Sequence, residues 1–172
     1  MRCGFWMPLT GRDDGQAATR ALVIGIGNEA RGDDAVGLEV ARRIGALGLT
    51  GVIALTEQRE GVALITAWQQ SRADRVVLVD AAVSGAPPGT VNRLRVSAGP
   101  LPLLDERGST HSIGVAQAIE LARVLGCLPT SLILYTVEAG QFDLGVALSP
   151  EVAGAVDEAV QRIRAEIEAI PP

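Results

Sequence analysis

The chain has 172 residues, of which 48% are hydrophobic and 20% charged, and this predicts one globular domain with a full core. Its net charge is −5 and its 15 basic residues form no stripe, which argues against nucleic acid or a membrane surface as the main partner. Two cysteines make no disulfide framework and no apolar run is long enough to span a membrane, so we expect a cytoplasmic protein.

The N-terminal part of the chain divides at residue 21. Residues 1–20 mix Gly, Pro, Thr and Asp without periodicity, which predicts a flexible extension before a single domain over residues 21–172. The short branched run Ala21–Ile24 is then stopped by Gly25 and Gly27. Such a run is typical of a buried, parallel strand.

Two aspartates follow the turn after this strand. The apolar residues from Ala35 to Leu47 recur at helical spacing and predict an amphipathic helix of about 14 residues. A helix beginning near Asp33 would be capped by that carboxylate. Asp34 is then a second carboxylate, held at the carboxyl end of the first strand, where open α/β sheets place their ligands.

The remaining sequence alternates between strand and helix patterns. The expected strands are Gly51–Thr56, Arg75–Asp80, Thr90–Val96 and Ser131–Val137. Three further helices are expected. One contains Val62–Trp68, and one runs from Ile113 to Leu125 after an N-cap at Ser109 or Thr110. The last runs from Pro150 to about Ile170, with Ser149 as its N-cap.

Two connections refine this pattern. No helix precedes Thr90–Val96, only a loop with Pro87, Pro88 and Gly89, so we expect this strand to be an antiparallel edge strand. The long segment Ser97–Thr110 predicts a functional or mobile loop. Together the elements predict a three-layer α/β/α sandwich, with a twisted, mostly parallel sheet of about five strands and one antiparallel strand.

Three residues are candidates for metal binding and catalysis: Asp34, Asp80 and His111. Each is expected at a strand end or a helix start on the same side of the sheet, so they would converge on one crevice. Two carboxylates and an imidazole, with open positions, suit nickel or zinc. The structural alternative is that Asp34 caps a helix, Asp80 caps a turn and His111 only precedes a helix.

The turn Gly25–Ala30 has a second interpretation. It fits a dinucleotide-binding fingerprint, with Glu57 as the acid that would bind a ribose. However, Glu29, Asp33 and Asp34 would then place negative charge against a pyrophosphate. The turn is therefore better suited to a cation.

Several segments resemble the hydrogenase maturation endopeptidases, which remove a C-terminal extension from the large subunit of NiFe hydrogenases after nickel insertion. They are Gly25–Asn28, Arg31–Gly37, Val79–Ala81, Pro88–Thr90, Thr110–Gly114 and Leu148–Val152, the last preceded by Glu138 and Gly145. The likeness spans Ala21 to about Ile170. One turn departs from the family pattern: where many relatives have Gly-Gly-Thr-x-Gly, this chain has Glu57–Gly61 and keeps only the last glycine.

The resemblance implies a function and a site. It places the family's two metal-binding carboxylates on Asp34 and Asp80 and its histidine on His111. It also implies a mixed five-stranded sheet, a large-subunit precursor as partner, and nickel supplied by that substrate, with zinc as an alternative ion in the resting protein. We expect a monomer. Asp33 or Glu57 would be a general base if the geometry allowed, although Asp33 is expected to cap a helix.

Two other functions stay open at this point. One is a nucleotide-binding or small-molecule-binding α/β protein that uses the Gly25–Ala30 turn. The other is a hydrogenase chaperone that binds the large subunit without cutting it.

Overall fold

The computed structural model of the chain describes residues 21–57, 61–73, 75–96 and 110–169, with only the backbone given for residues 110–113. The expected N-terminal extension, residues 1–20, lies outside these ranges. So does almost all of the expected long loop, residues 97–109.

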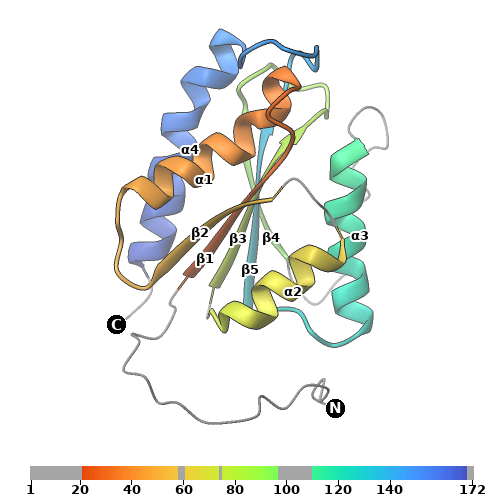
Figure 1. Cartoon of the computed structure of the whole chain (residues 1–172), viewed down its shortest axis with the longest axis vertical. Coiled ribbons are helices and arrows are strands. Elements are labelled where there is room, and N and C mark those ends of the chain that lie inside the picture. The colour runs from red at the N-terminus through yellow and green to blue at the C-terminus, as the bar shows by residue number, and fades with distance from the viewer. Residues whose placement is uncertain (1–20, 58–60, 74, 97–109, 170–172) are drawn as a thin grey trace.

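A five-stranded sheet forms the central layer (Figure 1). Its strands are β1 (Ala21–Ile26), β2 (Val52–Glu57), β3 (Arg75–Ala82), β4 (Val91–Val96) and β5 (Ser131–Glu138). Their order is β2-β1-β3-β5-β4, and every neighbouring pair is parallel except β4 and β5. This confirms the predicted mostly parallel sheet with one antiparallel edge strand. The inner strands are almost wholly buried because helices cover both faces.

In the described ranges, four α-helices and a short 3-10 helix complete the layers. They are η1 (Gly32–Ala35), α1 (Val36–Ala46), α2 (Val62–Ser71), α3 (Thr110–Val124) and α4 (Pro150–Glu168). Helices α1 and α4 pack on one face of the sheet, and α2 and α3 pack on the other (Figure 1). None of the helices in the described ranges is both long and apolar enough to cross a membrane.

Two boundaries differ from the sequence expectation. Helix α1 has 11 residues and begins at Val36, because the 3-10 helix η1 takes the place of the expected first turn. Strand β3 does not stop at Asp80 but continues to Ala82, since Ala81 and Ala82 pair with Val137 and Glu138 of β5. The side chain of Asp80 therefore projects from within the strand and not from the loop beyond it.

Glycines allow α1 to lie directly on the sheet. A Cβ atom built on Gly25 would lie 2.0 Å from the carbonyl oxygen of Gly37. One built on Gly37 would lie 2.3 Å from the Ile26 oxygen and 2.4 Å from the Val79 oxygen. No side chain fits at these distances, so the two glycines let the backbone of α1 touch β1 and β3. The same contact fixes η1, and with it Asp33 and Asp34, at the carboxyl edge of the sheet.

Candidate active site

Asp34 lies in η1, where it is completely buried. The turn before it passes through Gly27, whose φ of +146° is a conformation that residues with a side chain rarely adopt. A Cβ on Gly27 would lie 1.8 Å from the carbonyl oxygen of Asp34. The glycine therefore lets the chain fold back on itself and hold Asp34 next to the end of β1.

Asp80 occupies the next strand of the same edge. It is 2% exposed, and its Oδ1 accepts a hydrogen bond of 2.9 Å from the backbone N–H of Ala81. Because side chains alternate along a strand, Asp80 is on the same face as Val76 and Leu78. These two pack in the cluster that includes α3 residues such as Val115. Asp80 thus points toward the layer to which α3 belongs.

His111 is in the first turn of α3, as expected, but its side chain lies outside the described residues. Helix α3 and η1 both contact β3. The structure therefore brings together the three elements that carry Asp34, Asp80 and His111. Among the side chains that are described, which exclude that of His111, no group of three His, Cys, Asp or Glu residues is arranged to hold a metal ion.

Asp33 is not a helix cap, so that expectation is wrong. Its Oδ2 accepts hydrogen bonds from the N–H groups of Gly140 and Gln141, at 2.8 and 3.0 Å, and from the Ser149 hydroxyl at 2.9 Å. Its Oδ1 accepts one from the Ser149 N–H at 2.6 Å. This buried carboxylate joins η1 to the loop between β5 and α4. Because its oxygens already accept four bonds, Asp33 is poorly placed to act as a general base.

Glu138, at the end of β5, makes a second connection of this kind. Its Oε1 accepts hydrogen bonds from the N–H groups of Ser84 and Gly85, at 2.7 and 2.8 Å, and its Oε2 accepts one from the Ser84 hydroxyl at 2.8 Å. The side chain is 2% exposed. Glu138 therefore holds the loop that leads from β3 to β4. The sequence resemblance contained this residue, but no local pattern indicated what it binds.

We expect Asp33→Asn to destabilise the protein by about 2–4 kcal/mol, because an amide nitrogen would face N–H and hydroxyl donors in a buried, charge-assisted network. Urea unfolding followed by circular dichroism measures the change. Asp157→Asn is the matched control, since the Asp157 side chain is 74% exposed and its ion pair with Arg43 is a surface pair worth about 1 kcal/mol at most. Equal stability of the two variants would show that the Asp33 network contributes little.

Solved structures share this architecture. HybD, the hydrogenase maturating endopeptidase from Escherichia coli, has a TM-score of 0.69 and 26% identity, over 87% of this chain and 92% of that one. The [NiFe] hydrogenase maturation protease HycI from Thermococcus kodakarensis has a TM-score of 0.67 and 30% identity, again over 87% and 92% of the two chains. The sandwich is thus the fold of the hydrogenase maturation proteases.

Sequence comparison gives the same result. The family model described as hydrogenase maturation protease matches residues 59–166, a range that contains Asp80 and His111 and begins after Asp34. The hydrogenase expression/formation protein HupD of Thiocapsa roseopersicina is 30% identical over 146 residues, which are 81% of this chain and 64% of that protein. The chain belongs to the hydrogenase maturation protease family. The chemistry of this family is that of a hydrolase.

Proposed function

We propose that this chain is an endopeptidase that removes the C-terminal extension of a NiFe hydrogenase large-subunit precursor after nickel insertion. We also propose that Asp34, Asp80 and His111 recognise the nickel carried by that substrate. The proposal depends chiefly on the juxtaposition at the carboxyl edge, where two buried carboxylates lie on η1 and β3, beside the helix whose first turn contains His111.

The donor set suits a divalent ion with open positions. Buried carboxylates in proteins are paired, hydrogen-bonded or bound to a metal, and two carboxylates with one neutral imidazole match nickel or zinc. In this proposal Asp34 and Asp80 bind the ion through oxygen and His111 binds it through nitrogen. A bound ion of this kind supplies Lewis acidity toward a peptide carbonyl or a water molecule. By binding the ion that the substrate carries, the three residues hold the bond to be cleaved beside that ion.

The surrounding loops are suited to bind a protein substrate. The loop that Asp33 attaches to η1 exposes Leu144 and Val146, which are 75% and 39% accessible. The Gly145 N–H donates to the Ala30 oxygen at 2.8 Å, so these apolar side chains lie next to the turn that leads to Asp34. We assign them to contacts with the large-subunit precursor, in a cytoplasmic reaction.

The nucleotide-binding alternative has less support. In a dinucleotide-binding turn, the space beside the glycines would be open to the ligand. Here the carbonyl groups of Gly37 and Asp34 fill the space beside Gly25 and Gly27. The glycines are therefore explained by packing within the chain. No α-helix begins at the glycines either, because η1 comes first and α1 begins only at Val36.

The experiment that tests the function uses nickel-loaded and nickel-free precursor of the large subunit. We expect the purified chain to release a C-terminal peptide from the nickel-loaded form only, because the nickel-free precursor lacks the ion that the three residues recognise. Intact-mass spectrometry of the precursor measures the release.

Three results would contradict parts of the proposal. Equal cleavage of both forms would remove nickel from substrate recognition. Stable binding of the precursor without any loss of mass would instead favour the chaperone function. If the chain neither bound nor cleaved the precursor, both the endopeptidase and the chaperone function would be rejected.

A further inference from the structure

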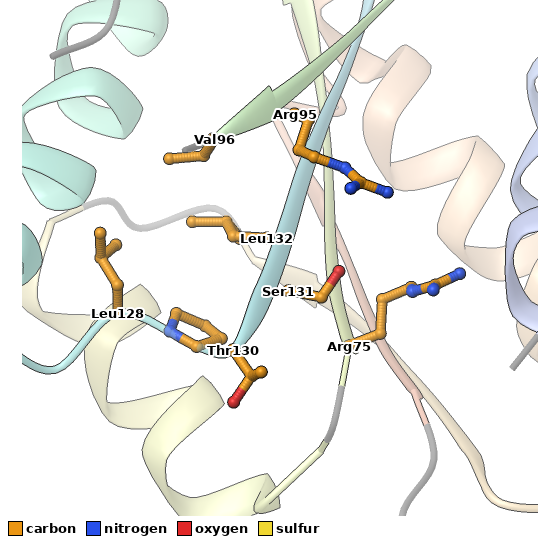
Figure 2. A pocket seen from close by; sticks show the side chains of 8 residues that line it. Arg75, Arg95, Val96, Leu128, Thr130, Ser131 and Leu132 are labelled. Atoms are coloured by element: carbon orange, nitrogen blue, oxygen red, sulfur yellow. The ribbon is translucent and has the colours of Figure 1, made fainter. Parts of the chain in front are cut away.

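A cavity of about 510 Å³ lies at the edge of the sheet opposite to Asp34 and Asp80 (Figure 2). Arg75 and Ser131 are the first residues of β3 and β5, and Arg95 is the next-to-last residue of the antiparallel β4, so all three reach this amino edge. The polar residues that line it are Arg75, Arg95, Thr130 and Ser131, and Leu128 and Pro129 contribute apolar surface.

The strand register places the two arginines on one face of the sheet. Arg75 pairs with Ser131, and Arg95 pairs with Ile133, two residues further along β5. Positions two residues apart share a face, and neighbouring strands are about 5 Å apart, so both long side chains reach the space above Ser131. Figure 2 shows both guanidinium groups and the Ser131 hydroxyl on the same side of β5.

Among the described side chains around the cavity, arginines outnumber carboxylates. One carboxylate, Glu166, serves two arginines: it accepts a 2.5 Å hydrogen bond from Arg93 Nε and lies 3.4 Å from Arg75 Nη1. Burial raises the pKa of the neighbouring Tyr135 hydroxyl, so that group stays neutral and adds no anion. Within the described part of the chain, Arg95 is exposed and forms no ion pair.

Arg75 also has donor capacity that the described residues do not use. Its side chain is 19% exposed, yet its Nε is buried and has no hydrogen-bond partner among them. A buried, charged donor without an acceptor costs free energy, and an anion in the cavity would remove that cost. Here the excess of arginine occurs in a chain whose net charge is −5.

We propose that this cavity binds a small molecule through a carboxylate or phosphate group held between Arg75 and Arg95, with the Ser131 hydroxyl as a further donor. Guanidinium groups present planar pairs of N–H donors that match both kinds of oxyanion. The volume exceeds that of the anionic group alone, so the cavity has room for the rest of a small ligand. This site is distinct from the carboxyl edge and does not depend on the proposed peptidase function.

Titration calorimetry with inorganic phosphate and with succinate tests the site, at an ionic strength kept constant with sodium chloride. We expect saturable binding of at least one of them by the parent protein. Arg95→Gln should weaken it about tenfold or more, the effect of losing one charge-assisted contact. Arg42→Gln is the control: it removes the same charge from α1, where Arg42 pairs with Glu29 and is 45% exposed. It should leave the affinity unchanged.

Nuclear magnetic resonance locates the binding. Amide signals of Thr130 and Ser131 should shift with the added anion in the parent protein and stay in place in Arg95→Gln. Binding of phosphate alone, or of succinate alone, would identify the class of ligand. The site is rejected if neither anion binds saturably, or if Arg95→Gln binds the anion as tightly as the parent protein does. Arg95 is the residue to change because Arg75 also bonds the backbone oxygen of Glu166, so its loss would disturb α4.

Discussion

Replacing Asp34 or Asp80 by asparagine should reduce cleavage of the nickel-loaded precursor about 100-fold or more, which corresponds to about 2.7 kcal/mol of transition-state stabilisation. Each change keeps the shape of the side chain but removes the charge that a divalent ion prefers in an oxygen ligand. Both residues are almost fully buried, at 0% and 2% exposure, so solvent cannot compensate for the loss. The initial rate of peptide release, measured by intact-mass spectrometry, gives the effect.

The comparison with Asp33 makes this result specific. Asp33→Asn should mainly lower stability, because its carboxylate holds a loop, whereas Asp34→Asn and Asp80→Asn should keep the fold and lose the reaction. Asp157→Asn, on the exposed side of α4, should cleave at the parent rate. If Asp34→Asn or Asp80→Asn cleaved as fast as the Asp157 variant, that residue would have no place in the site.

Gly27→Ala should lower the free energy of unfolding by about 3 kcal/mol or more, a large part of the 5–15 kcal/mol typical of a domain. The new Cβ would lie 1.8 Å from the Asp34 carbonyl oxygen, so the backbone must move, and a φ of +146° is strained for alanine as well. Because the displaced group is the backbone of Asp34 itself, any protein that still folds should also cleave poorly. Thermal and urea unfolding, together with the cleavage assay, measure both effects.

Gly154→Ala is the matched control for this change. Gly154 lies inside α4, and a Cβ there would meet nothing within 4 Å. An alanine in an exposed helix interior should stabilise the protein by about 0.5–1 kcal/mol. If Gly27→Ala proved as stable and as active as the Gly154 variant, the turn before Asp34 would be an ordinary loop.

The fold could be predicted because its signals are local. Short branched apolar runs marked the four parallel strands, and the missing helix before Thr90–Val96 marked the antiparallel one. The position of Asp34 also followed from local order, since the turn that follows a buried parallel strand lies at the carboxyl edge of the sheet. The predicted helix-cap role of its neighbour Asp33 was wrong, because the sequence pattern of an aspartate before a helix is the same whether its carboxylate caps that helix or binds another segment.

The contacts that could not be predicted join distant parts of the chain. Asp33 binds Gly140 and Ser149, which are 107 and 116 residues away, and nothing near Asp33 indicates these partners. The cavity lined by Arg75 and Arg95 could not be predicted either. These arginines lie on strands on either side of β5, and only the register of both strand pairs places them together. An exposed arginine on an edge strand usually indicates only solubility, so the sequence pattern gave no reason to connect the two.

The strand order also imposes a sequence of events on the growing polypeptide. Strand β4 leaves the ribosome before β5, yet β5 is the strand with which it pairs, and β5 must insert between β3 and β4 to complete the sheet. Until then β3 has an open side and β4 has no neighbour, and such exposed strands are prone to join other chains. A nascent chain therefore has to protect an unfinished sheet until Ser131–Glu138 has been synthesised.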